Sequence, residues 1–485
     1  MDNLKKKSYK AFGWDFIGRL GSQGIGFIIS VILARLLLPD DFGLLAMINI
    51  VVIVANVFMD MGLGVSLIQR KDVRDEHYGT VMFLNIGTGA LMSVILFLSS
   101  GFIADFFNKE QLKLISRAMS SVIFISSFGN VIRAKLRKEL NYAVLTKTTW
   151  IGASVSGVVG IVMAFMGYGV WSLVFQSILN PLITNLSLYY LERWRPKIIF
   201  SIQALKDLWG YGFNMFLSSV IDVIFAQIDS LIIGKISTPA QLGFYYRAAS
   251  FKLLVERYSS GSINSIAFPL FSQLQDNREA YNKAVFSIVN VVCFLSFFIA
   301  GLLYIVADDL FIILFTDKWA QSIPMFKIML WASFAPTVGS ILINVISSLG
   351  NSRLYLILSI IKKIIILGAF FVGYHYGIFP LLYAMFVTTT IYYFLNVYAA
   401  SKVMNVSSMN FLKPTFLSAI IAVGIIAVLI YIDRLTGLTN HFARLIMYSV
   451  LFVVFYLFSN QLFRVEGWNY VKNEIRIIIE RKKTK

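Results

Sequence analysis

The sequence is poor in charged residues, and this sets the class of protein. Of its 485 residues only 14% are charged, 58% are hydrophobic, and the mean hydropathy is +0.75. Soluble globular chains have an apolar share of about half. The composition therefore excludes a soluble globular chain and predicts an all-α polytopic membrane protein.

Cysteine, histidine and nucleotide-binding glycine loops are also scarce or absent. The only cysteine, Cys293, lies in an apolar run, which excludes an internal disulfide. The three histidines, His77, His375 and His441, fall in separate connections, which argues against a metal site. No G-x-x-x-x-G-K-[ST] loop occurs, so ATP is not the direct driver of the protein. We expect no catalytic residue, no metal and no cofactor.

Long hydrophobic runs fill most of the chain. A helix needs about 20 apolar residues to cross a bilayer. Fourteen stretches meet this requirement, centred near residues 24, 53, 92, 124, 158, 179, 221, 255, 295, 336, 364, 388, 422 and 451. The connections between them are too short to hold a soluble domain.

The formal net charge of +18 follows the topology of the chain. Most Lys and Arg residues fall in connections on the side of the N-terminus, and few fall on the opposite side. This asymmetry obeys the positive-inside rule and predicts that both termini are cytoplasmic. Because the positive net charge is explained by membrane topology, it does not indicate a nucleic-acid partner. Lys5-Lys6-Lys7 followed by an apolar run imitates a signal peptide, but the continuation to Ala34 without an A-x-A site indicates a retained first span.

One segment of the chain is repeated. Ala34-Arg35-Leu36-Leu37-Leu38-Pro39-Asp40-Asp41-Phe42-Gly43 reappears as Gly234-Lys235-Ile236-Ser237-Thr238-Pro239-Ala240-Gln241-Leu242-Gly243, 200 positions later and without a gap. In both copies a cation ends one apolar run, Pro sets a turn, and Gly opens the next run. The membrane part is therefore predicted to be a duplication, and repeats of this kind place a substrate path at the interface of the halves.

Polar residues form stripes on several predicted spans. In the first span Asp15 and Arg19 are four residues apart and can pair on one helix face. In the second span Asn56 and Asp60 share a face. The seventh span places Asn214, Ser218, Asp222 and Asp229 along one side. In hydrocarbon such faces must look into protein or water.

The eighth span carries charges where the first copy of the repeat has none. Its polar and charged residues include Arg247, Lys252, Glu256, Arg257 and Asn264. Each mid-helix charge costs about 2.5–3.5 kcal/mol on insertion scales. We expect these groups to line an aqueous cavity, although a Lys252-Glu256 pair of purely structural importance would also explain two of them.

Three further cations and three carboxylates lie in the second half. Lys327, Lys362 and Lys363 fall within predicted spans and are candidates for the cavity. Snorkelling could relieve one of the latter two. Asp308, Asp309 and Asp317 are expected to be solvated in an external connection.

The tail combines aromatic and basic residues. Trp468 and Tyr470 alternate with Lys472 and Arg476 in the segment Gly467–Lys485. This pattern is typical of a helix that lies on an anionic cytoplasmic leaflet.

The stretch Ile32 to Leu44, and more weakly Gly350-Asn351-Ser352-Arg353, resembles the Wzx-type polysaccharide exporters of the MOP flippase superfamily. The resemblance covers about residues 10–430. It implies two pseudo-symmetric six-helix lobes, at 1–195 and 196–405, two further spans at 406–465 and a cytoplasmic tail at 466–485. It also implies alternating access, with an undecaprenyl-diphosphate-linked oligosaccharide moved from the inner to the outer leaflet of a bacterial cytoplasmic membrane. Exporters of exopolysaccharide, O-antigen or teichuronic-type polymers are the most similar sub-types.

Residue roles follow as hypotheses from this substrate. A lipid diphosphate is an anion, and the compensating cations would be Arg19, Arg247, Lys252, Arg257, Lys327, Lys362 and Lys363. The glycan would meet Asn56, Asn214, Ser218, Glu256 and Asn264. Coupling ions would bind Asp60, Asp222 or Asp229. Membrane lipids are expected partners, and a polysaccharide polymerase and glycosyltransferases are possible ones.

Two rival functions stay open. An ion-coupled drug antiporter of the same superfamily would export cations, which a cationic cavity would repel. A membrane glycosyltransferase would need an acid pair, for which Asp40-Asp41 is the candidate. The second copy of the turn, Pro239-Ala240-Gln241, lacks both carboxylates, and no large external domain is present, which argues against an enzyme.

Overall fold

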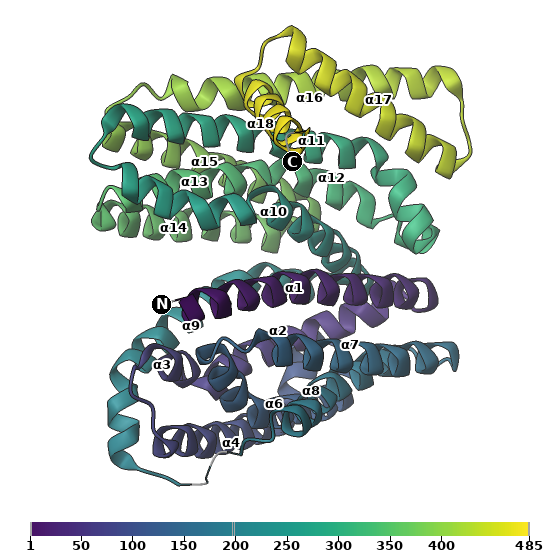
Figure 1. The fold of residues 1–485 in the computed structure, drawn as a ribbon. Helices are drawn as coiled ribbons and strands as arrows, with labels where there is room; N and C mark the ends of the chain where they lie inside the picture. The colour runs from purple at the N-terminus through teal and green to yellow at the C-terminus, as the bar shows by residue number, and fades with distance from the viewer. Residues whose placement is uncertain (1, 196, 198, 484–485) are drawn as a thin grey trace. The chain divides into compact units, whose positions relative to one another are not determined.

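The backbone forms helices and, within the described residues, no strand (Figure 1). The computed structural model describes residues 2–195, 197 and 199–483, with the side chains of all of these except 2–10, 254–255, 257–262, 264–265, 352, 475, 478–479 and 481–483. Contacts divide the chain into two units, Met1–Gly243 and Phe244–Lys485. The chain passes from one to the other within a single helix.

The first unit contains nine helices and the start of a tenth. They are α1 (Asp2–Leu36), α2 (Pro39–Asp60), α3 (Leu63–Gln69), α4 (Asp75–Leu98), α5 (Ser100–Phe107), α6 (Gln111–Lys138), α7 (Tyr142–Phe165), α8 (Val170–Glu192) and α9 (Ile202–Ile236). Within this unit α7 packs against both α1 and α8, and α6 packs against α4 and α8.

Small residues let α1 and α7 come close together. A methyl group placed on Gly18 would lie 2.3 Å from Thr146 Oγ1, so only glycine fits there. The Trp150 indole N–H donates to the Gly18 carbonyl oxygen at 3.2 Å. A methyl group on Gly26, by contrast, would meet nothing within 4 Å. Close packing of α1 therefore depends on Gly18 rather than on every small residue of the helix.

The second unit is built around one long helix. Its elements are α10 (Pro239–Leu274), which begins in the first unit, α11 (Arg278–Phe315), the 3-10 turn η1 (Asp317–Trp319), α12 (Ser322–Ala332), α13 (Phe334–Ser348), α14 (Ser352–Tyr376), α15 (Ile378–Met404), α16 (Met409–Thr436), α17 (His441–Leu462) and α18 (Glu466–Lys483). Helix α11 has 38 residues and contacts α12, α13, α16, α17 and α18.

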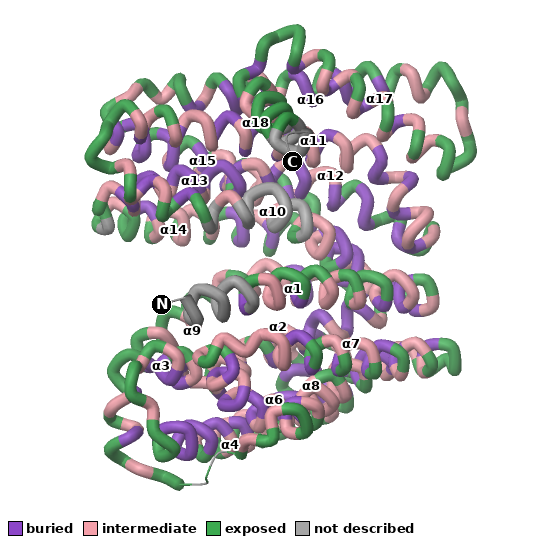
Figure 2. Tube along the Cα trace, viewed as in Figure 1, coloured by how far each residue is buried: buried purple, intermediate pink, exposed green. Residues whose placement is uncertain are grey.

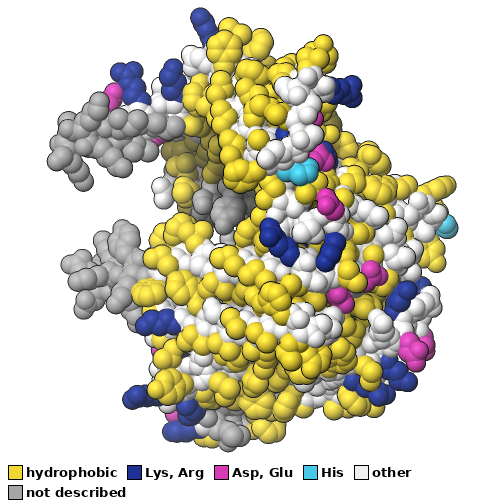
Figure 3. Space-filling view, turned by 90° about the vertical axis from the view of Figure 1, so that its right-hand side faces the viewer, with side chains coloured by type: hydrophobic (Ala, Val, Ile, Leu, Met, Phe, Trp, Pro, Cys, Tyr) yellow, Lys and Arg dark blue, Asp and Glu magenta, His cyan; other side chains and the backbone are white. Residues whose placement is uncertain are grey.

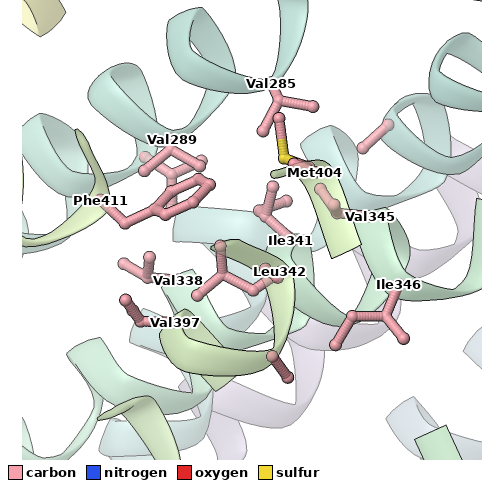
Figure 4. Close-up of a cluster of buried hydrophobic side chains, with 14 of the residues drawn as sticks. Val285, Val289, Val338, Ile341, Leu342, Val345, Ile346, Val397, Met404 and Phe411 are labelled. Carbon is pink, nitrogen blue, oxygen red and sulfur yellow. The ribbon is translucent and has the colours of Figure 1, made fainter. Parts of the chain in front are cut away.

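A core of branched aliphatic side chains holds α11, α13, α15 and α16 together. Figure 4 shows Val289 of α11, Leu342 of α13, Val397 of α15 and Phe411 of α16 pointing toward one another. All four are at most 2% exposed. Dispersion contacts of this kind are small one by one and large in sum, so they fix how these four helices pack in the bilayer, where water does not drive association.

Twelve helices of the described chain are long and apolar enough to cross a membrane. The other two predicted spans are the helices α8, with 23 residues, and α10, with 36. A helix thus stands at each of the fourteen predicted centres, and the predicted all-α membrane fold is confirmed. Hydrophobic side chains cover much of the face shown in Figure 3, as contact with a bilayer requires.

Burial differs widely between helices, as Figure 2 shows. In the most apolar window of α2, 56% of the residues are buried, whereas in that of α9 only 6% are. Helix α9 therefore presents most of its circumference to lipid or water, and its polar residues decide which.

The tail forms α18 and begins with contacts to α11. Asn290 donates to the Glu466 carboxylate at 3.0 Å, and the Trp468 ring lies 5.8 Å from that of Phe294. The predicted helix is therefore present, while its placement on a lipid leaflet stays a prediction.

Candidate functional site

The repeated turn has the same backbone in both copies. Helix α1 ends at Leu36 and α9 at Ile236, and the helices that follow begin at Pro39 and Pro239. The Asp41 carboxylate accepts the Leu38 amide at 3.0 Å. Gln241 accepts the Thr238 amide through its side-chain oxygen at 3.2 Å. The two copies therefore end and begin their helices at matching positions, the duplication itself stays a prediction, and Asp41 acts as a helix cap.

The two copies of the turn also lock into each other within the first unit. A methyl group on Gly43 would lie 1.8 Å from the Pro239 carbonyl oxygen, and one on Gly243 would lie 2.1 Å from that of Pro39. The contact is reciprocal, as expected of two related segments. Backbone approaches backbone so closely that no side chain larger than hydrogen fits at either glycine.

Helix α9 carries the polar stripe that the sequence predicts. Asn214, Ser218 and Asp222 are exposed, and Asp229, which is partly buried, accepts the Ser230 amide at 2.7 Å. Because α9 is apolar enough to cross a membrane, an exposed amide and carboxylate on it would be costly against lipid. This side of α9 is therefore suited to face water.

Helix α2 places its predicted polar residues in the half next to α3. Asn56 donates to the Val52 carbonyl oxygen of its own helix at 2.9 Å, and both residues are at most partly exposed. The Asp60 carboxylate lies against Gly64, where a methyl group would be 2.9 Å from Asp60 Oδ1. The charge of Arg133 also acts on Asp60.

Arg133 is a polar residue whose environment the sequence did not reveal. Its guanidinium donates to Asn185 at 3.0 Å, to Asn130 at 2.9 Å and to the Ser126 carbonyl oxygen at 3.1 Å. Asn130 stands one turn before Arg133 on α6, which was a visible signal. Asn185 comes from α8, and only the packing of α6 on α8 brings it there.

Two predicted cations form ion pairs with a carboxylate four residues away. Arg19 pairs with Asp15 at 2.9 Å and its side chain is 75% exposed. Lys252 pairs with Glu256 at 3.2 Å, with 28% and 23% of the two side chains exposed. Both partnerships follow from the helical spacing. The side chains of Arg257 and Asn264 lie outside the described residues.

Arg247 is buried in an aromatic cage of the second unit. Its guanidinium carbon lies 4.7 Å from the centroid of Phe315 and 4.8 Å from that of Trp319, and the residue is 4% exposed. Such cation–π contacts stabilise an arginine that has left water. In this conformation Arg247 is in place to hold the start of α10 against α11 and η1, and its contact with substrate stays a prediction.

The remaining predicted cations lie at separate places in the second unit. Lys327 pairs with Asp308 at 2.6 Å and lies 5.2 Å from the centroid of Tyr304. Lys362 donates to Asn396 Oδ1 of α15 at 2.6 Å. Lys363 is partly buried. Lys327 and Lys362 thus have different partners, and Asn396 is one that sequence reasoning missed.

The expectation that Asp309 is simply solvated is wrong. Asp309 is 1% exposed and its Oδ1 lies 2.7 Å from His441 Nδ1 and 3.2 Å from Arg444 Nε. Asp308 also has a partner, in Lys327. Helix α17 packs against α11 and supplies His441 and Arg444, an arrangement that the local sequence of α11 does not contain.

No group of three or more potential metal ligands occurs among the described residues. The polar groups that the structure does gather are amides, hydroxyls, carboxylates and cations on membrane-spanning helices. Their chemistry is that of binding and ion pairing.

Sequence comparisons with known proteins find proteins of polysaccharide biosynthesis. Residues 32–324 match the family model described as polysaccharide biosynthesis protein. The chain is 24% identical over 357 residues to the succinoglycan biosynthesis transport protein ExoT of Rhizobium meliloti, covering 74% of this chain and 72% of the relative. It is 24% identical over 344 residues to the lipopolysaccharide biosynthesis protein WzxC of Escherichia coli, covering 70% and 69%.

The fold is similar to that of a solved flippase. The structure aligns with lipid II flippase MurJ, in an inward closed conformation, with a TM-score of 0.71 at 15% identity, covering 92% of this chain and 98% of that one. At this identity the likeness concerns the fold, which is that of a polytopic helical membrane protein.

Proposed function

Because this chain belongs to the polysaccharide biosynthesis protein family, we propose that it is a flippase for a lipid-linked oligosaccharide. It moves an undecaprenyl-diphosphate-linked repeat unit from the inner to the outer leaflet by alternating access. The names of ExoT and WzxC, a transport protein and a lipopolysaccharide biosynthesis protein, support this substrate class. The product serves the synthesis of a surface polysaccharide.

The observation that carries the proposal is the polar stripe of α9. Asn214, Ser218 and Asp222 are exposed on a helix whose most apolar window has 6% of its residues buried. A sugar needs hydroxyl and amide partners in water, and this stripe supplies them. A channel for small apolar molecules would have no use for such a surface in the membrane.

The paired cations offer a way to bind and release the diphosphate. Arg19 and Lys252 each hold a carboxylate four residues away on the same helix. An exposed pair such as Asp15-Arg19 contributes only about 0.3–0.5 kcal/mol. A diphosphate can therefore displace the carboxylate at small cost and form stronger charged hydrogen bonds. When the substrate leaves, the carboxylate again neutralises the cation.

We further propose that binding of an ion supplies the free energy for transport. Asp60, Asp222 and Asp229 are the carboxylates that would bind a coupling proton or sodium ion. Asp60 lies in a region that also contains Arg133, so a cation bound there would change how Asp60 interacts with α6. This coupling would link ion binding in the first unit to its packing.

The proposed location is the bacterial cytoplasmic membrane with both termini in the cytoplasm. The distribution of Lys and Arg supports this orientation. Membrane lipids surround the protein, and a polymerase and glycosyltransferases are the partners we expect for the pathway. The chain is a carrier in this proposal and performs no covalent chemistry.

The rival functions have less support. Asp41, the second carboxylate of the candidate enzyme pair, caps α2 through the Leu38 amide. A capping role explains its presence without catalysis. A drug antiporter with the same fold would need an anionic cavity, and the second copy of the repeat adds cations such as Lys252 instead.

The first experiment reverses the charges of α10. In a flippase-deficient strain, Lys252→Glu with Arg257→Glu should abolish surface polymer while the protein stays in the membrane. The matched control is Lys71→Glu with Lys206→Glu, two exposed lysines outside the polar stripes. Unchanged polymer in the first double variant would refute the assignment.

A second experiment separates binding from structure at the Lys252-Glu256 pair. Replacing both residues by methionine removes the charges but keeps volume, which is often neutral for stability. If the pair is purely structural, Lys252→Met with Glu256→Met should export normally. We expect export to fall by about ten-fold, the effect of losing one charged hydrogen bond.

A further inference from the structure

An apolar groove lies in the first unit, apart from the polar stripe of α9. Its volume is about 500 Å³, within the range of about 300–1,000 Å³ typical of ligand sites. Residues of α2, α4, α5 and α9 line it, including Ala55, Ile95, Phe102, Phe106 and Leu231. Nearly all of the lining is hydrocarbon, so the groove is suited to an apolar chain.

A cation stands at the edge of this groove. Lys235 of α9 donates to the Phe106 carbonyl oxygen at 2.5 Å, and its ammonium lies 4.8 Å from the centroid of the same ring. Phe106 forms part of the groove wall. An ammonium has three N–H donors, so Lys235 can hold the carbonyl oxygen and still bind a phosphate.

Helix α9 carries both the polar stripe and part of the groove wall, on opposite sides, because Asp222 and Leu231 are about two and a half helical turns apart. Leu231 lines the groove, and Asp222 ends the exposed part of the stripe nine residues earlier, about 14 Å along the helix. One helix therefore carries a surface for sugars, a wall for an apolar chain and a cation for phosphate. These are the three chemical parts of a polyprenyl-diphosphate-linked oligosaccharide.

We infer that the groove binds the first isoprene units of the substrate's polyprenyl chain, with Lys235 contacting the diphosphate. This inference rests on the proposed function. Lys235 lies next to the turn at Pro239, which the predicted orientation places at the external side. In this orientation the groove binds the polyprenyl chain after the head group has reached the external side and before the lipid enters the outer leaflet. The cations of α1 and α10 would bind it earlier.

The test places a photo-reactive residue in the groove and a matched one outside it. Phe102 and Phe165 are 72% and 71% exposed, both lie in the first unit, and only Phe102 lines the groove. Each is replaced by p-benzoyl-phenylalanine in the full chain, in cells that make the lipid-linked repeat unit. After irradiation, mass spectrometry identifies the attached lipids.

The expected result is a polyprenyl-diphosphate adduct at position 102 that exceeds the adduct at position 165 by about ten-fold. Adding Lys235→Gln, which keeps an N–H donor for Phe106 and removes the charge, should lower the adduct at 102 by a similar factor. A fluorescence-detected melting curve verifies that this variant is folded.

Three outcomes would overturn the inference. Phospholipid adducts in equal amounts at both positions would mean that the groove holds bulk lipid. An adduct at 102 that does not depend on Lys235 would remove the phosphate contact. In both cases a wild-type chain that restores surface polymer leaves the proposed function intact. A wild-type chain that fails to restore polymer would overturn the proposed function and this inference with it.

Discussion

The turn between α1 and α2 and the turn between α9 and α10 share their backbone and differ in their charges. The cap oxygen comes from Asp41 in one and from Gln241 in the other, with similar distances to the amide. Four positions beyond Gly43, Met47 is fully buried. Its counterpart Arg247 is buried as well, but between two aromatic rings. The two copies therefore share the geometry of the turn, and the cations lie in the second copy.

The two turns also differ in what a charge would meet there. Around Arg247, α11 and η1 supply Phe315 and Trp319, whose ring faces attract a cation. The exposed fraction of Met47 is 0%, in a helix packed against α4, α6 and α9. A new charge in the first copy would be fully buried. We expect the cation of the second copy to depend on the aromatic residues around it.

The largest effect should come from exchanging these two residues between the copies. Met47→Arg buries an uncompensated charge, so we expect a loss of several kcal/mol and failure of the protein to accumulate. Arg247→Met removes the buried charge together with the cation–π contribution, about 0.5–2 kcal/mol, so we expect a smaller loss. Membrane abundance and melting temperature in detergent measure both. Equal tolerance of the two changes would contradict the role of the cage.

A smaller effect is expected where the two turns interlock. Gly43→Ala introduces a methyl group 1.8 Å from the Pro239 carbonyl oxygen, and relieving this overlap should cost about 1–3 kcal/mol. The control is Gly26→Ala on α1, where a methyl group meets nothing within 4 Å. Helix propensity alone predicts that this control is neutral or slightly stabilising. A Gly43→Ala variant as stable as the control would mean that the turns do not touch.

The smallest effect should come from the caps. Asp41→Ala and Gln241→Ala should each cost about 0.5–2 kcal/mol, the usual effect of a lost helix cap. Asp41→Asn keeps a cap oxygen and should export polymer normally. An acid pair in a glycosyltransferase would lose activity with the same change, so a polymer assay on Asp41→Asn decides between the two roles. If Asp41→Asn loses the polymer but keeps a normal melting temperature, the glycosyltransferase hypothesis would be supported instead.

Helical spacing made part of the site predictable. Asp15 and Arg19, and likewise Lys252 and Glu256, are four residues apart, so pairing follows from a single helix. The stripe on α9 was predictable for the same reason. In contrast, Lys362 meets Asn396 from another helix, and Asp309 meets Arg444 from a segment 135 residues away. No local pattern contains such partners.

By itself the sequence determined that this chain is a helical membrane protein, where its helices lie, and that one turn occurs twice. Hydrophobic length and helical period are local properties, and a bilayer leaves the backbone little alternative to helices. The tertiary structure alone decided that Arg247 is caged by aromatic rings, that Asp309 is buried beside His441 and Arg444, and that four helices line an apolar groove. These features depend on which helix faces which neighbour, and that is set by close packing of side chains distant in the chain.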